Sequence, residues 1–184
     1  MAGIVLITGG CRSGKSRFAL EKANSIEGKK FFLATCPRVD SEMEERIQRH
    51  QRERINWDTI EEETELSSVF DSIPSDSVVL LDCLSLWINN LMYHANGKNL
   101  YLTEEQIKDT CTKLGQHILD SQTKSVFIVT NEVGMGLVPE TKEGRQYRDL
   151  LGICNQTFSS LANEVYFLVS GIPIRIKPSL DISL

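Results

Sequence analysis

The segment GGCRSGKS, residues 9–16, matches the phosphate-binding pattern G-x-x-x-x-G-K-[ST] in full. It directly follows the apolar run IVLIT (4–8) and opens a stretch with helical character. Glycines let the backbone curl so that successive N–H groups face a phosphate, and the N-terminus of the following helix adds a positive end. The alternative is a glycine turn that arose by chance. Because both the motif and its context are satisfied, we predict that this loop binds a nucleoside triphosphate.

Three further side chains could complete the chemistry of a bound triphosphate. Lys15 can reach the β and γ phosphates, and the Ser16 hydroxyl can bind Mg²⁺. Asp82 ends the apolar run VVLLD (78–82), where a carboxylate can hold Mg²⁺ directly or through water. The alternative role for Asp82 is the N-cap of a helix in CLSLWINNLM (83–92), and the two roles are compatible.

The segment VTNEVGMGLVPE (129–140) follows another apolar run and carries Asn131 and Glu132 at its start. Ligands of parallel sheets bind beyond the carboxyl ends of the strands, and the glycines allow the backbone to approach closely. This pattern predicts part of a site, and a tight structural turn is the alternative.

The segment SEMEERIQRHQRER (41–54) sets His50 among arginines. Arg46, His50 and Arg54 are four residues apart and would share one face of a helix. Neighbouring guanidinium groups favour a neutral, nucleophilic imidazole, and they could also grip nucleotide phosphates. Acidic residues placed four positions before basic ones are equally typical of a solvated, charged helix, which is the alternative.

The elements that must position these residues follow from five apolar runs. They are continuous rather than alternating, which is typical of parallel strands covered on both faces. The runs are IVLIT (4–8), FFLAT (31–35), VVLLD (78–82), VFIVT (126–130) and VYFLV (165–169). IPIRIK (172–177) alternates, which predicts a short antiparallel edge strand. We therefore expect an α/β fold with a mostly parallel sheet flanked by helices.

Two segments have clear helical character, residues 16–26 and 103–120. In the second, four apolar residues recur at helical spacing, namely Ile107, Cys111, Leu114 and Ile118. Residues 94–103 are polar and predict a loop, and residues 178–184 predict a loose tail. We interpret the other two histidines, His94 and His117, as surface or helix-flank residues.

The composition bounds the class of protein. A chain of 184 residues fits one domain, which we expect to span residues 1–184. The net charge of −5 argues against broad nucleic-acid or membrane binding, and no apolar stretch approaches the ~20 residues of a membrane helix. The 5 cysteines show neither zinc spacing nor a disulfide framework, and no secretory signal is visible, so we expect a cytoplasmic protein.

Taken together, the motifs resemble those of the bifunctional adenosylcobinamide kinase/adenosylcobinamide-phosphate guanylyltransferases of cobalamin assembly. The likeness covers about residues 4–177 and rests on segments in family order: ITGGCRSGKS, ATC, RIQRHQRER, W-x-T-x-E at 57–61, VVLLDC, VTNEVGMGLVPE and VSGIPIRIK. Many families share the phosphate loop alone. TNEVGMG together with RI-x-x-H-x-x-x-R is far more specific.

The resemblance implies two activities. The first phosphorylates the aminopropanol hydroxyl of adenosylcobinamide with ATP or GTP. The second transfers GMP from GTP to that phosphate through a GMP-histidine intermediate, and His50 matches the family's nucleophile. The implied fold is the RecA-type phosphate-loop domain, usually assembled as a trimer, with Mg²⁺ as cofactor.

The resemblance also maps the GTP contacts onto this chain: Gly9, Gly10, Cys11, Arg12, Ser13, Gly14, Lys15, Ser16, Ala34, Thr35, Cys36, Gln51, Arg52, Glu53, Arg54, Glu61 or its neighbour Glu62, and Asp82. Two positions depart from some relatives. Arg49 stands where some carry a second histidine, which makes the assignment of His50 less ambiguous. Asp82 stands where some carry glutamate, so its reach to the metal or guanylyl group can differ.

Other classes of function remain open at this stage. One alternative is a phosphate-loop kinase for another small metabolite, in which His50 has only a structural role. Observed nucleotidyl transfer would exclude this alternative, because a plain kinase needs no covalent intermediate. A non-enzymatic nucleotide switch or an assembly ATPase subunit would hydrolyse the nucleotide without any acceptor. Single-stranded nucleic-acid binding by the arginine stretch fits poorly, because no aromatic residues are interleaved with it.

Overall fold

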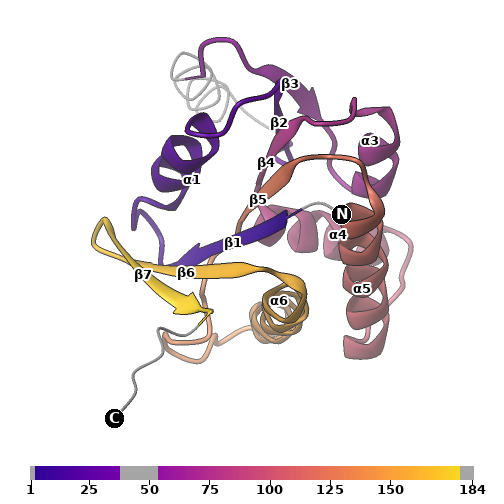
Figure 1. Ribbon diagram of the computed structural model, residues 1–184. Helices are drawn as coiled ribbons and strands as arrows, with labels where there is room; N and C mark the ends of the chain where they lie inside the picture. Colours follow the sequence, from indigo (N-terminus) through magenta and orange to yellow (C-terminus); the bar gives the residue numbers. More distant parts are fainter. Residues whose placement is uncertain (1–2, 38–53, 179–184) are drawn as a thin grey trace.

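A seven-stranded sheet runs through the middle of the protein in the order β3-β2-β4-β5-β1-β6-β7 (Figure 1). The structure is a computed structural model and describes residues 3–37 and 54–178. The strands are β1 (Gly3–Gly9), β2 (Lys30–Ala34), β3 (Asp58–Glu61), β4 (Val78–Asp82), β5 (Ser125–Val129), β6 (Glu164–Val169) and β7 (Ile172–Lys177). The helices are α1 (Lys15–Asn24), α3 (Leu66–Ser72), α4 (Leu84–Gly97), α5 (Glu104–Asp120) and α6 (Lys142–Leu161).

The sheet is parallel except at one edge. β1 pairs in parallel with both β5 and β6, and β4 lies between β2 and β5. These strands are covered on both faces, which explains why their sequences are continuously apolar. β7 turns back from β6 and pairs with it antiparallel, as the alternating run 172–177 predicted. The predicted fold class is therefore confirmed.

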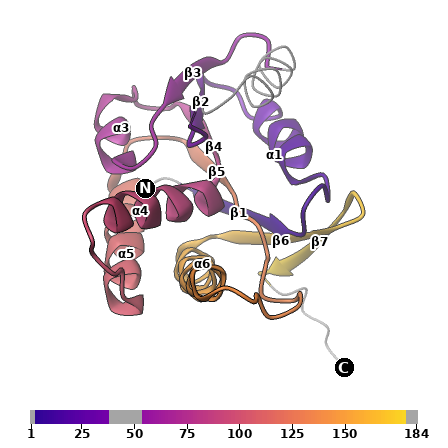
Figure 2. The ribbon, with the colours of Figure 1, turned by 180° about the vertical axis from the view of Figure 1, so that it is seen from behind.

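Helices cover both faces of the sheet. α1 lies on one face, and α3, α4, α5 and α6 lie on the other, as Figure 2 shows from behind. The larger apolar cluster lies under these four helices, and its fully buried side chains include Leu81, Ile88 and Phe158. The smaller cluster lies under α1 and includes Ile7, Ala19 and Phe127. No helix in the described ranges is long and apolar enough to cross a membrane.

α5 confirms the helix predicted over 103–120. Ile107, Cys111, Leu114 and Ile118 are its buried residues, so the helical spacing does mark the buried face. Thr103 is the N-cap and forms a reciprocal capping box with Gln106. His94 lies exposed in the last turn of α4. His117 lies in the last turn of α5, with its Nε2 2.9 Å from Asp71 Oδ1.

Two expectations were wrong. The loop predicted over 94–103 begins only after Gly97, because α4 continues through Ala95, which is buried against the core. Tertiary packing here outweighs the poor helix propensity of Asn96 and Gly97. The N-cap of α4 is Cys83, not Asp82, because Cys83 is the last extended residue before the helix. The carboxylate of Asp82 therefore does not cap this helix.

Candidate active site

The phosphate loop joins β1 to α1 at the carboxyl edge of the sheet. Gly9 has φ 149° and Gly14 has φ 92°, and Arg12 between them is also left-handed at φ 53°. A Cβ on Gly9 would lie 2.5 Å from the carbonyl oxygen of Leu168 in β6. Glycine is therefore required at this position both by the backbone conformation and by the neighbouring strand.

Lys15 is the first residue of α1, and its side chain turns back into the loop. Its Nζ donates to the carbonyl oxygen of Gly10 at 2.6 Å and lies 3.5 Å from Ser13 Oγ. Only 7% of Lys15 is exposed, and burial lowers its pKa. The negative charge of Asp82 opposes that shift, because the carboxylate at the end of β4 lies within electrostatic reach of the Lys15 ammonium.

The N-terminus of α1 is open for an anion. Gly14 is the N-cap and offers no side-chain cap bond, and the first turn carries no acidic residue. Ser16 lies half-buried in this first turn. Backbone N–H groups at a helix N-terminus attract phosphate, so this end of α1 is suited to the charge of a nucleotide.

A buried hydroxyl joins the ends of β2 and β4. Thr35 Oγ1 donates to the carbonyl oxygen of Cys83 at 2.8 Å and accepts from the Cys83 backbone N–H at 2.9 Å. The Asp82–Cys83 peptide bond is cis. Asn90 of α4 donates to the Thr35 carbonyl oxygen at 2.8 Å. These bonds set the backbone directly after Asp82.

A chain of polar contacts continues from Cys83 towards β5. Its Sγ lies 2.9 Å from Ser85 Oγ, which accepts from Asn131 Nδ2 at 3.0 Å. Burial raises the pKa of the Cys83 thiol to about 11 and that of Tyr147, which donates to the Ser85 carbonyl oxygen, to about 12. Both groups are therefore neutral near pH 7. They act in packing and hydrogen bonding rather than as nucleophiles.

The segment after β5 adjoins the phosphate loop, as the strand-end rule predicted. The Glu132 backbone N–H donates to the Gly9 carbonyl oxygen at 3.0 Å, and the Asn131 side chain is held by Ser85. Asn155 of α6 donates to the Asn131 carbonyl oxygen at 3.0 Å. Asn131 thus has a structural role towards α4 and α6, while the Glu132 backbone continues the pairing of β5 with β1 beyond Val129.

The residues after β2 and β3 lie side by side. The Glu62 backbone N–H donates to the Ala34 carbonyl oxygen at 3.0 Å, which continues the parallel pairing beyond Glu61. The Glu62 carboxylate accepts from the backbone N–H groups of Thr64 and Glu65, 2.8 Å each. These bonds hold the pKa of Glu62 below its usual range. Glu62 is thus engaged in the turn before α3, whereas Glu61 is exposed.

Arg54 packs on the face of the sheet that α1 covers. Its guanidinium lies 3.3 Å from the ring centroid of Phe32, and only 8% of the residue is exposed. Trp57 follows it and donates from Nε1 to Asn24 Oδ1 of α1 at 3.1 Å. His50, Gln51, Arg52 and Glu53 lie outside the described residues.

The turn between β6 and β7 touches the phosphate loop from the other side. The Gly171 N–H donates to the Ser13 carbonyl oxygen at 2.9 Å, and this turn lies beside the start of α1 in Figure 1. The motif VSGIPIRIK carried no chemical prediction from the residues themselves. The available signal for a turn was Gly171 between two apolar runs, and in the structure this glycine has a positive φ of 84°.

The structure therefore brings most of the predicted residues to one edge of the sheet. The loop Gly9–Ser16 lies at the end of β1, Ala34 ends β2 with Thr35 and Cys36 directly after it, and Asp82 ends β4. Glu61 ends β3 on the other side of β2. The sequence analysis did not predict the hydrogen bonds of Thr35 to Cys83, of Asn90 to Thr35, or of Asn131 to Ser85. It also did not predict the contact of Gly171 with Ser13. Asn90 was detectable, because it is one of two adjacent amides in the largely apolar stretch LWINNLM (86–92).

A family model described as cobinamide kinase / cobinamide phosphate guanyltransferase matches residues 5–176. The chain belongs to this family. It is thus a bifunctional enzyme of the cobinamide kinase and cobinamide phosphate guanylyltransferase type.

Curated relatives agree over nearly the full length of this family member. The chain is 36% identical to the bifunctional adenosylcobalamin biosynthesis protein CobU of Escherichia coli K12, covering 95% of this chain and 99% of the relative. It is 35% identical to CobU of Salmonella typhimurium (95% and 99% covered) and 33% identical to CobP of Pseudomonas aeruginosa (94% and 96% covered).

A solved structure shares the fold. It is a prototypical ATPase from the type III secretion system of pathogenic bacteria, with a TM-score of 0.56 and 10% identity. The match covers 91% of this chain and 51% of that one, so the chain spans about half the length of the ATPase. At this identity the likeness supports the phosphate-loop α/β fold and nothing more.

Proposed function

We propose that the enzyme acts twice on one substrate in adenosylcobalamin biosynthesis. It phosphorylates the aminopropanol hydroxyl of adenosylcobinamide with ATP or GTP. It then transfers GMP from GTP to that phosphate, giving adenosylcobinamide-GDP. The observation that carries the proposal is the family match over residues 5–176, and the phosphate loop facing Asp82 supports it.

In the kinase reaction, the loop Gly9–Ser16 holds the phosphates by its backbone N–H groups and by the N-terminus of α1. Lys15 contacts the β and γ phosphates once its ammonium exchanges the Gly10 carbonyl oxygen for a phosphate oxygen. The burial of Lys15 strengthens this contact, because little water remains to screen it. The charge of the Asp82 carboxylate favours the cationic form of Lys15 and so opposes the lowering of its pKa by burial.

The donor set fits Mg²⁺. Ser16 offers a hydroxyl at the start of α1, and Asp82 offers a carboxylate facing the same loop. Hard oxygen ligands of this kind, with phosphate oxygens and water, are those that Mg²⁺ prefers. When bound, the ion would neutralise the charge of the phosphates.

In the guanylyl transfer, His50 is the proposed nucleophile. Its imidazole attacks the α-phosphorus of GTP, a P–N bond forms, and the bond to pyrophosphate breaks. The phosphate of adenosylcobinamide phosphate then attacks the same phosphorus and releases the imidazole. Gln51, Arg52, Glu53 and Arg54 are proposed as nucleotide contacts beside His50. The Arg54 guanidinium stacks on Phe32, which fixes Arg54 on the face of the sheet that α1 covers.

The remaining contacts follow the strand ends. Ala34, Thr35 and Cys36 are proposed to lie against the nucleotide through their backbone, because the Thr35 side chain is engaged with Cys83. Of the two adjacent glutamates we propose Glu61 as the nucleotide contact. The Glu62 carboxylate is held by two backbone N–H groups in the turn before α3, which supports this choice.

We further propose a single phosphate-loop domain over residues 1–184 that works as a homotrimer in the cytoplasm. None of the 5 cysteines, all of which lie in the described ranges, forms a disulfide, and Cys83, Cys111 and Cys154 are buried, which suits a reducing compartment.

The decisive experiment uses intact-mass analysis after incubation with GTP and Mg²⁺ and no corrinoid. The wild-type protein should gain one guanylyl group in an acid-labile, alkali-stable linkage. His50→Ala should lose both the adduct and guanylyl transfer while retaining kinase activity, because the phosphate loop is untouched. His94→Ala is the matched control, because His94 is exposed at the end of α4, and it should behave as wild type. An adduct that persists in His50→Ala would exclude the histidine intermediate.

A further inference from the structure

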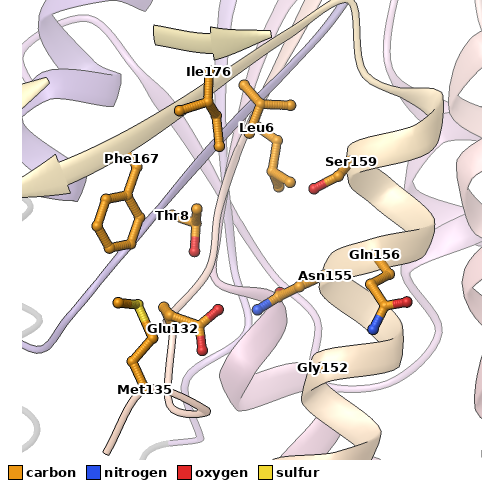
Figure 3. A pocket seen from close by; sticks show the side chains of 11 residues that line it. Leu6, Thr8, Glu132, Met135, Gly152, Asn155, Gln156, Ser159, Phe167 and Ile176 are labelled. Carbon is orange, nitrogen blue, oxygen red and sulfur yellow. The ribbon is translucent and has the colours of Figure 1, made fainter. Parts of the chain in front are cut away.

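A cleft of about 840 Å³ opens between α6 and the β1, β6 and β7 end of the sheet. Figure 3 shows side chains of α6 on one side of it and Phe167 and Met135 across from them. Leu6, Phe167 and Ile176 supply apolar walls. A volume of this size is typical of sites for small molecules.

The cleft also holds polar groups that could orient a ligand. The Thr8 hydroxyl is buried at its base and has no hydrogen-bond partner within the described ranges. Gln156 of α6 also lines the cleft and is exposed, so its amide is accessible to a ligand. The Glu132 carboxylate lies between α6 and Met135 in Figure 3. A buried hydroxyl without a partner is costly, which favours a site that a ligand completes.

The cleft adjoins the phosphate loop directly. Thr8 immediately precedes Gly9, and the Glu132 backbone N–H donates to the Gly9 carbonyl oxygen at 3.0 Å. A molecule seated against α6 could therefore extend a flexible arm around the end of β1 to a phosphate at the loop. An acceptor substrate must bring its reacting hydroxyl to the phosphate at the loop while the rest of the molecule binds elsewhere. The nucleotide already binds at the loop and does not need the cleft.

We propose that this cleft binds the corrin ring edge of the cobinamide substrate, an inference that rests on the proposed function. A cobinamide is an amphipathic macrocycle with methyl groups and amide side chains on its rim, and one arm ends in the reacting hydroxyl. The methyl groups suit Phe167 and Ile176, and the amides can pair with Gln156 and Thr8.

Charge favours the corrinoid over a second nucleotide. Among the described residues that line the cleft there is no lysine or arginine, and the one ionisable group is the carboxylate of Glu132. A triphosphate would be repelled by that carboxylate. The adenosyl-cobalt(III) corrin carries a net positive charge, because one corrin and one alkyl anion offset two of the three charges of cobalt, so the carboxylate attracts it.

Gly152 offers a variant that fills the cleft without disturbing the fold. It lies within α6 and lines the cleft, and a Cβ built on it meets no atom within 4 Å. Gly152→Leu should therefore extend into the space proposed for the ring while improving helix propensity. Gly97→Leu is the matched control, since Gly97 ends α4 away from the cleft and has the same open surroundings.

The test measures steady-state phosphorylation of adenosylcobinamide by both variants, together with Tm, oligomeric mass and the GTP-only adduct. Gly152→Leu should raise KM for adenosylcobinamide by at least about 10-fold, as steric loss of binding space does. Its kcat, Tm, oligomeric mass and adduct formation should match wild type, and Gly97→Leu should match wild type throughout. Gln156→Leu should raise the same KM by a smaller factor.

An unchanged KM in Gly152→Leu, with wild-type folding, would overturn the assignment of the cleft. A lost oligomer would also overturn it, because the cleft would then be a contact between copies of the chain. Failure of the proposed function is separately visible: the wild-type enzyme would then neither phosphorylate adenosylcobinamide nor form the adduct.

Discussion

Replacing Thr35 by valine tests whether its hydroxyl sets the backbone after Asp82. Valine keeps the volume and branching of threonine but cannot bond the Cys83 peptide groups. Thr35 is fully buried, so no water replaces the lost hydroxyl. The Cys83 carbonyl oxygen still accepts from the Trp87 backbone N–H at 3.2 Å, whereas the Cys83 N–H loses the Thr35 partner.

The magnitude follows from that asymmetry. One buried N–H left without a partner costs about 1–3 kcal/mol, so we expect the free energy of unfolding to fall by about 2 kcal/mol. With a urea m-value of about 2 kcal/mol/M, the unfolding midpoint should fall by about 1 M. Thr35→Ser keeps the hydroxyl and loses one methyl group, which costs about 0.8 kcal/mol and lowers the midpoint by less than half as much.

The assay is urea unfolding at one protein concentration, followed by a Mg²⁺ titration of kinase activity. Thr35→Val should also need more Mg²⁺ for half-maximal activity, because Asp82 directly precedes the released peptide, while Thr35→Ser should need the wild-type amount. The reasoning is refuted if the valine variant is more stable than the serine variant, since methyl packing rather than the hydroxyl would then matter.

Two further changes address charge in the site. Lys15→Ala should lower kinase kcat with saturating ATP by about 10²–10³-fold, because a preorganised cation at the transferred phosphate is lost; near-wild-type turnover would remove Lys15 from the mechanism. Glu62→Gln should lower the free energy of unfolding by about 1 kcal/mol near pH 7. Since the folded-state pKa of Glu62 is depressed, that stabilisation is complete above its ordinary pKa of 4.5 and is lost as the pH falls through the folded value. Unfolding of both proteins from neutral to acid pH should therefore show the difference shrinking, and a constant difference would argue against the carboxylate cap.

The apolar pattern predicted the interior of the fold well. The five continuous runs correspond to β1, β2, β4, β5 and β6, because burial on both faces imposes apolar residues at every position. β3 escaped prediction for the opposite reason. As an edge strand of 4 residues with three of them exposed, its sequence DTIE carries no apolar run.

The helices show a different limit. α6 was not singled out, although Leu150, Leu151, Cys154 and Phe158 recur on one face and Thr141 caps it. The apolar spacing is present only in the later turns of α6, because its first two turns consist mainly of polar residues. The end of α4 could not be predicted, because the burial of Ala95 depends on elements distant in sequence.

The backbone of the loop Gly9–Ser16 could be predicted, because its motif couples residue type to backbone conformation. The Thr35–Cys83 contact could not, since it joins residues 48 apart through peptide groups that every residue possesses. Glu61 and Glu62 are adjacent residues of the same type, so the sequence does not favour either one as the nucleotide contact. In the structure they differ because two backbone N–H groups hold the Glu62 carboxylate, while Glu61 is exposed at the end of β3.

The contact between Gly171 and Ser13 has a consequence for synthesis of the protein on the ribosome. The phosphate loop lies near the N-terminus, yet β1 is flanked by β5 and β6, and the loop is bonded by the turn that follows β6. A nascent chain lacking its last strands has no neighbour on one side of β1 and no Leu168 behind Gly9. We therefore expect nucleotide capture to wait until the β6–β7 hairpin has emerged from the exit tunnel, after the other strands of the sheet.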